Sequence, residues 1–209
     1  RHHRTVQRHR YYLGGLDPRR QHHFLSAVRS RNGGKRVCMG KLHHCDWTQL
    51  MAKKNVANDI GLFAIWAVHN NKRFRYLQYR PVQYKITPVM KYDCSSFATL
   101  CYRVAGAGDP NGPVYHYNGW GNTETLANNG KRIPAALARP GDIAIFNVGK
   151  PLNTQHAAVV VQKDLKFPLL VSMGQEGDPS FMRANQDPRP VAYFRYDTTQ
   201  KWPPLEYAS

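Results

Sequence analysis

Apolar positions along the chain follow a helical period first and a strand pattern later. Between residues 58 and 69 they recur three and four positions apart, which predicts an amphipathic helix. These positions are Ile60, Phe63, Ala64, Ala67 and Val68. A second predicted helix follows Asp93, because Asp93 is a favourable N-cap and apolar residues then share one side of the segment up to Gly106.

Strand-like segments follow both predicted helices. Apolar runs occupy residues 143–146, 156–161, 169–173 and 191–196, and the turn Arg139-Pro140-Gly141-Asp142 leads into the first of them. Because helices precede strands with hairpin-like connections, the predicted fold class is α+β with a mostly antiparallel sheet.

Two segments between these elements read as loops. Residues 70–91 are basic and aromatic, and Pro81 and Pro88 interrupt them, so at most short strands are expected there. Residues 109–130 are rich in Gly and Asn, which predicts a long loop. Ordered loops of this length are usually functional.

The chain divides into a basic N-terminal extension, residues 1–57, and a folded domain, residues 58–209. Arg and His dominate residues 1–36, and apolar residues there are sparse and aperiodic. This composition is typical of a solvated tail or of a segment that binds an anionic surface. Residues 37–56 predict no more than a short helix around Trp47 and Leu50.

The charge of the chain indicates an anionic partner. Lys and Arg number 30 and Asp and Glu 13 among 209 residues, so the formal net charge is +17. Nucleic acid, an anionic cell-wall polymer and an acidic membrane surface all fit such a field. A mean hydropathy of -0.60 and the lack of an apolar run of about twenty residues argue against a transmembrane span.

Four cysteines are too few for a disulfide-built scaffold of this length. Cys94 and Cys101 are seven residues apart on one predicted helix, hence about 10 Å apart, which excludes a disulfide between them. Cys38 and Cys45 can pair. With His43 and His44 they superficially resemble zinc ligands, but their spacing matches none of the common zinc patterns, so neither a metal nor another cofactor is predicted.

The candidate chemistry is that of an activated thiol. A cysteine in the first turn of a helix meets unpaired backbone N–H groups that favour the thiolate, and Asp93 places Cys94 there. His156 heads an apolar strand, which would fix its imidazole as the base. The backbone N–H of Cys94 can donate to an oxyanion. Taken singly, each residue also fits an inert buried thiol or a surface histidine, so the hypothesis rests on the pair.

Three ordered motifs closely resemble those of the NlpC/P60 cell-wall peptidases, in particular the phage endolysin and tail-lysin branch. They are Tyr92-Asp93-Cys94-Ser95-Ser96-Phe97, Arg139-Pro140-Gly141-Asp142-Ile143-Ala144-Ile145-Phe146 and His156-Ala157-Ala158-Val159-Val160-Val161. The resemblance covers about residues 58–197. It implies a papain-like fold in which the helix bearing the cysteine packs on the sheet.

The resemblance also implies cleavage of an amide bond in the stem peptide of bacterial peptidoglycan, with Cys94 as nucleophile and His156 as base. The family usually has a third polar residue that orients the histidine, but Met173 stands at that position. Gln175 is the candidate substitute, and Ser172 is the alternative. Five residues in or beside the loops around the cysteine are the candidates for substrate binding: Tyr84, Asp93, Ser95, Asn118 and Trp120.

Two other functions remain open from the sequence. Met173 and the basic extension also fit a virion (tail) structural protein that keeps a peptidase fold without its activity. The net charge also fits a nucleic-acid-binding protein, although no motif of such folds is present. As a hydrolase, the protein is expected in a phage virion or released onto the host wall, and the extension is expected to bind anionic wall polymers or other virion proteins.

Overall fold

The helices α3 and α4 precede the main run of strands in this computed structural model. It describes residues 55–164, 166–175, 177–199, 201–203 and 205. Nearly all of the predicted N-terminal extension lies outside these residues, as do Cys38, His43, His44 and Cys45. The described α-helices are α3 (Val56–His69), α4 (Cys94–Val104) and α5 (Thr123–Asn129). The described strands are β1 (Phe74–Tyr76), β2 (Met90–Tyr92), β3 (Lys131–Ile133), β4 (Ile143–Phe146), β5 (His156–Gln162), β6 (Leu169–Ser172), β7 (Ser180–Arg183) and β8 (Val191–Arg195).

Short 3-10 helices connect several of these elements: η2 (Asn71–Arg73), η3 (Ala135–Leu137), η4 (Leu152–Thr154) and η5 (Ala184–Gln186).

The main sheet has the strand order β3-β8-β4-β5-β6-β7, and each neighbouring pair is antiparallel. Strands β1 and β2 form a separate parallel pair that ends immediately before Asp93. The predicted α+β class with a mostly antiparallel sheet is therefore confirmed. The insertion of β8 between β3 and β4 was not predicted, because hydrophobic pattern gives strands but not their lateral order.

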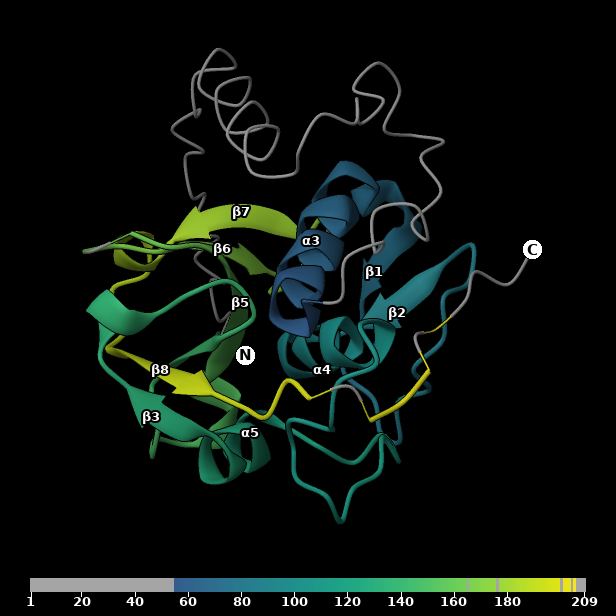
Figure 1. Ribbon diagram of the computed structural model, residues 1–209. Helices are drawn as coiled ribbons and strands as arrows, with labels where there is room; N and C mark the ends of the chain where they lie inside the picture. The colour runs from purple at the N-terminus through teal and green to yellow at the C-terminus, as the bar shows by residue number, and fades with distance from the viewer. Residues whose placement is uncertain (1–54, 165, 176, 200, 204, 206–209) are drawn as a thin grey trace, which may run out of the picture. The chain divides into compact units, whose positions relative to one another are not determined.

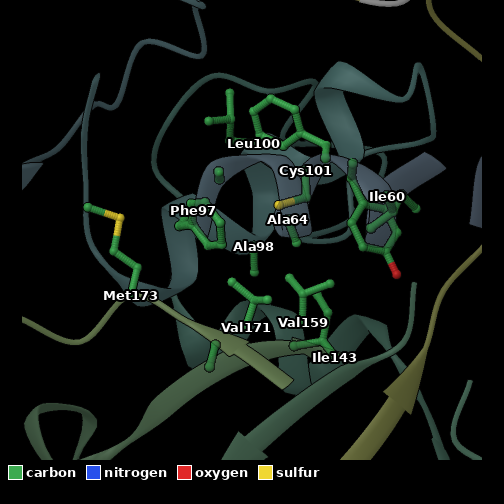
Figure 2. Packing of buried hydrophobic residues seen from close by; sticks show 14 of the residues in the cluster. Ile60, Ala64, Phe97, Ala98, Leu100, Cys101, Ile143, Val159, Val171 and Met173 are labelled. Carbon is green, nitrogen blue, oxygen red and sulfur yellow. The ribbon is translucent and has the colours of Figure 1, made fainter. Parts of the chain in front are cut away.

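The two faces of the sheet have different neighbours. Ile143 and Ile145 of β4, together with Val159 and Val171, belong to a core shared with α3 and α4 (Figure 1, Figure 2). The residues between them, such as Ala144 and Phe146, belong to a second cluster on the opposite face. This alternation follows from the two-residue period of a strand. One face of the sheet therefore packs against α3 and α4, and the opposite face does not.

The second long helix begins at the predicted cap, Asp93, whereas the first begins two residues before its predicted start. The side chain of Asn55 accepts a hydrogen bond from the backbone N–H of Asn58 at the start of α3. Asp93 caps α4, and Gly106 follows its end with φ +73°, a backbone conformation that glycine adopts without strain. None of the helices in the described residues combines the length and the apolar character needed to cross a membrane.

The predicted loop 109–130 contains a helix that the sequence analysis missed. Asn122 accepts hydrogen bonds from the backbone N–H groups of Glu124 and Thr125 and so starts α5. The Asn-rich composition obscured this helix, because asparagine is common both in loops and at helix N-caps. Residues 109–122 remain a loop, and residues 70–91 contain the short helix η2, the short strand β1 and the start of β2.

Candidate active site

Cys94 is the first residue of α4, and its thiol lies against the start of β5. The backbone N–H groups of Ala157 and Ser95 donate hydrogen bonds to the sulfur. Asp93 forms a capping box with Ser96: its carboxylate accepts from the backbone N–H of Ser96, and its own backbone N–H donates to the Ser96 hydroxyl. The capping box fixes the first turn of α4. The thiol is therefore held beside the residue that follows His156.

His156 is the first residue of β5, and its Nε2 atom lies 2.6 Å from the Oγ atom of Ser172. The strand register explains this contact. Ala158 faces Ser172 across the β5–β6 pair, and His156 lies two residues before Ala158, on the same face of the sheet. The Phe146 ring lies beside the imidazole, with centroids 5.9 Å apart. The contact with Ser172 fixes the ring through one nitrogen, on the sheet face of Phe146 and Ala158, which is opposite the face that packs against α4.

Ser172, rather than Gln175, is the residue that contacts His156. The side chain of Gln175 is exposed, and its backbone N–H donates to the carboxylate of Asp178. Met173 is fully buried in the core shared with the helices (Figure 2). Since neighbouring residues of a strand point to opposite faces, Met173 packs toward α4 while Ser172 is directed to the face that bears His156. The family resemblance places the third polar residue at position 173, whereas the hydroxyl that contacts His156 belongs to the preceding residue, Ser172.

Burial dominates the protonation of both reactive groups. It raises the pKa of the Cys94 thiol to about 11; the negative charge of Asp93 adds to this rise, and the hydrogen bonds from Ala157 and Ser95 and the charge of Arg80 oppose it. Burial also lowers the pKa of His156 to about 4, and the positive charge of Arg189 adds to this fall. At neutral pH the resting state is therefore a neutral thiol beside a neutral imidazole, not an ion pair.

Arg80 joins the cysteine helix to two neighbouring segments. Its guanidinium forms an ion pair with Asp93 at 2.8 Å and donates to the hydroxyl of Ser95 at 2.9 Å. Its Nε atom donates to the backbone carbonyl of Gly121 at 2.8 Å. The two residues that flank Cys94 thus share one cation, which also lowers the pKa of the thiol. The sequence analysis missed Arg80, because an ion pair that spans a loop leaves no periodic signal.

The loop 109–122 is fixed close to this end of α4. Besides the contact of Gly121 with Arg80, the backbone carbonyl of Gly119 accepts from the N–H of Val82 at 3.0 Å. Gly119 has φ +86°, and a Cβ atom there would lie 2.2 Å from the Val82 carbonyl oxygen, so a larger residue does not fit. Trp120, between these two glycines, is 58% exposed. The exposed Asn118 accepts from the backbone N–H of Trp120.

The two tyrosines near the site differ in position. Tyr84, a predicted substrate-binding residue, is buried: it stacks on Tyr92 with centroids 6.3 Å apart and is 9% exposed. Tyr76, which was not predicted, is partly buried at the end of β1, and its hydroxyl accepts from Gln78 at 2.7 Å. Burial raises the pKa of Tyr76, and the negative charges of Cys94 and Asp93 raise it further. The charge of Cys94 thus reaches Tyr76, whereas Tyr84 packs between the rings of Tyr92 and Tyr117.

The residues predicted to bind substrate or to orient the histidine divide into those connected to the start of α4 and those that are not. Through Arg80, Asp93 and Ser95, the N-terminal turn of α4 is connected to the loop of Asn118 and Trp120. Tyr84 lies in the core and Gln175 lies beyond the end of β6, so neither joins this group. No group of three or more His, Cys, Asp or Glu side chains with metal-site geometry occurs among the residues that the structure describes.

Comparison of the chain with known protein families, with curated protein sequences and with solved structures finds no match.

The described residues include the groups that thiol-dependent acyl transfer requires, although His156 is held on the sheet face opposite α4. A thiol at a helix N-terminus, a buried imidazole with one nitrogen held by a hydroxyl, and nearby N–H and O–H donors are the parts that such chemistry requires. Cys101, on the same helix, is fully buried and lies in the hydrophobic core. The two thiols of α4 are thus distinguished by their surroundings, and Cys94 is the one at the N-terminal turn.

Proposed function

We propose that the protein is a cysteine peptidase or amidase that cleaves an amide bond in the stem peptide of bacterial peptidoglycan. The observation that carries this proposal is the contact between His156 and Ser172, next to a strand start that also binds the Cys94 thiol. A histidine held through Nε2 keeps Nδ1 available as a base, and a Cys-His hydrolase requires this imidazole to reach the thiol from the sheet face that it shares with Phe146. The papain-like identity of the fold is part of the same proposal.

In the proposed reaction, the thiol of Cys94 attacks the carbonyl carbon of the scissile amide and His156 accepts the thiol proton at Nδ1. The imidazolium is held by Ser172 through Nε2–H. His156 then gives the proton to the leaving amine nitrogen as the C–N bond breaks, which leaves a thioester on Cys94. Water, deprotonated by His156, hydrolyses the thioester and restores the thiol.

The developing oxyanion has two nearby donors. The backbone N–H of Cys94 lies in the first turn of α4, where helical N–H groups have no partner within the helix. The hydroxyl of Tyr76 is the second candidate, because it lies close enough to Cys94 for the thiolate charge to raise its pKa. These donors compensate for the neutral resting state, since they act on the charge that develops during attack.

The substrate class rests on the resemblance to NlpC/P60 peptidases together with the loop geometry. Peptide substrate would lie along the N-terminal turn of α4, where Asp93, Ser95 and the exposed Trp120 border the thiol. The net charge of +17 favours an anionic surface such as a cell wall. We infer a phage origin and action in the virion tail or on the host wall from the same resemblance.

The test is digestion of purified peptidoglycan from several bacteria by the wild-type protein, Cys94→Ala and Cys101→Ala. We expect the wild type and Cys101→Ala to release the same fragments, with new termini identified by mass spectrometry, and Cys94→Ala to release none. The cysteine at 101 is the matched control because it lies on the same helix. Equal release by all three proteins, or release by none on any wall tested, would contradict the proposal.

A virion structural role is the second candidate, and the burial of the thiol favours it. Cys94 is 9% exposed, and its pKa is raised rather than lowered. A protein that keeps the fold for assembly would show this burial and would lack turnover. Labelling with a small thiol-reactive probe separates the two, because a hydrolase must expose Cys94 to its substrate and a structural relic need not.

A further inference from the structure

A groove of about 680 Å³ lies on the sheet face opposite α3 and α4. Strands β3 and β8 and the segments at 166–167, 184–185 and 189–190 line it. Tyr193 and Ala184 in its wall belong to the second hydrophobic cluster, whereas Cys94 is carried by a helix that packs against the first. The groove therefore lies on the face away from the thiol. Arg189 in its wall lies over the Phe146 ring beside His156, so the groove adjoins the histidine but not Cys94.

The charged side chains that line the groove are all cationic. They are Arg132, Lys166 and Arg189, and none of the described lining residues is acidic. Arg189 forms an ion pair with Asp187. It therefore offers hydrogen-bond donors to the groove but adds little net positive charge. The side chains of Arg132 and Lys166 are exposed and form no hydrogen bond or ion pair with the described residues, although the Lys166 ammonium lies over the Phe167 ring. Two uncompensated cations beside a concave surface attract an anion.

The aromatic side chains in the groove do not offer free ring faces. Tyr193 is 3% exposed, and the ammonium of Lys166 lies over the Phe167 ring, 5.3 Å from its centroid. Proteins that hold single-stranded nucleic acid stack its bases on accessible aromatic rings. The groove lacks that feature, so its chemistry fits regularly spaced phosphates on a chain without stacking bases.

Charge also argues against two other occupants. The N-terminal segment 1–36 is rich in Arg and His, and a second copy of the chain carries a net charge of +17. Both have the same sign as the rim and would be repelled. A phosphate-bearing polymer has the complementary sign.

We propose that this groove binds a phosphodiester-linked glycopolymer of the bacterial cell wall. Phosphates pair with Arg132 and Lys166, and the carbohydrate or polyol units lie against the apolar wall. The choice of a wall polymer rests on the proposed function. The site would hold the protein on its substrate from the sheet face, while the opposite side of the sheet carries the reactive thiol.

Binding of purified poly(glycerol phosphate) wall polymer to full-length Cys94→Ala protein tests the proposal, with neutral dextran as the uncharged control. The inactive background separates binding from hydrolysis, so a failure of the proposed catalysis does not affect the result. The pocket variant is Arg132→Glu/Lys166→Glu. The matched variant is Lys131→Glu/Lys163→Glu, which has the same net charge and alters exposed neighbours that do not line the groove.

We expect the pocket variant to lose about tenfold more affinity than the matched variant. The slope of log affinity against log salt concentration should also be shallower by about two in the pocket variant. Ala135→Trp, which fills the groove without changing charge, should also weaken binding and serves if the double variant does not fold. Equal losses in both double variants, or unaltered binding by Ala135→Trp, would overturn the proposal. Tighter binding of single-stranded DNA of equal charge, lost in the same variants, would also overturn it and assign the groove to nucleic acid.

Discussion

The Oγ atom of Ser172 lies 2.6 Å from Nε2 of His156, on the strand next to the one that the histidine begins. This contact supplies the orienting group that Met173 cannot provide. In the tautomer whose Nε2–H donates to Ser172, Nδ1 is unprotonated and is the nitrogen that accepts a proton.

Replacing Ser172 by Ala should lower kcat/KM for peptidoglycan fragments by about 10- to 100-fold, because the imidazole loses the partner that fixes its tautomer and orientation. Ser172→Thr, which keeps the hydroxyl, should recover part of the loss. Gln175→Ala is the control and should retain full activity, since its side chain is exposed. The reverse ranking, with Gln175→Ala impaired and Ser172→Ala active, would assign the orienting role to Gln175.

Arg80→Ala should destabilise the protein by about 1–3 kcal/mol, because Asp93 and Ser95 are buried and would lose a charged partner. It should also slow alkylation of Cys94 at a fixed pH, since the guanidinium favours the thiolate. Urea unfolding and the rate of iodoacetamide labelling measure the two effects. Lys91→Ala, an exposed cation on β2, should change neither, and an unchanged labelling rate in Arg80→Ala would remove Arg80 from the site.

The rate of Cys94 alkylation should rise steadily with pH above neutrality and reach half of its maximum only near pH 11. The reason is the burial that raises the thiol pKa to about 11, whereas an ordinary exposed thiol ionises near pH 8.5. Stopped reactions at a series of pH values, followed by peptide mass spectrometry, give the rate at Cys94 alone. A plateau already present near pH 6 would indicate a resting thiolate–imidazolium pair instead.

His156 should make the protein less stable as the pH falls. Its pKa is lowered to about 4 in the folded state, so its contribution is fully present above pH 6.5 and is lost as the pH falls toward 4, in total by roughly 3 kcal/mol. Asp59 acts in the opposite direction over part of this range, because burial raises its pKa to about 6. The difference in unfolding free energy between wild type and His156→Gln isolates the histidine, since Asp59 is present in both. A difference that stays constant between pH 7 and pH 4 would contradict the assignment.

Trp120→Ala should raise KM by about three- to tenfold and leave the melting temperature unchanged. Its side chain is 58% exposed on a loop held by Gly119 and Gly121, so it can contact substrate but contributes little to the fold. Steady-state kinetics with a soluble stem-peptide substrate measure the effect. Val114→Ala, on the same loop and more exposed, is the control. An equal change in both variants would show that Trp120 has no specific role.

The elements with a strong local signal were predicted correctly. The apolar period of α3, the cap at Asp93 and the buried run of β5 each depend on neighbouring residues, and all three appear where the sequence placed them. The helix α5 was missed because its Asn-rich sequence resembles a loop. Strand β3 was missed because it is three residues long and largely exposed.

Only the parts of the candidate site that have a local sequence signal were predicted. Cys94 and His156 each stand at the start of an element, which a sequence shows directly. Ser172 depends on the register between β5 and β6, since a shift by one residue would present Met173 instead. Arg80 and Tyr76 come near the thiol because of the path that segment 70–91 takes, and that path has no periodic signal in the sequence. Those contacts become visible only in the three-dimensional structure.

The most direct test of the central claim is detection of the thioester on Cys94. Wild-type protein and Cys94→Ala are mixed with a stem-peptide substrate, quenched in acid within the first turnover and examined by peptide mass spectrometry. The account predicts a transient acyl adduct on Cys94 that forms and decays at rates consistent with product release, and neither adduct nor product with Cys94→Ala. Product formation by Cys94→Ala, or an unmodified Cys94 and no product with the wild type, would contradict it.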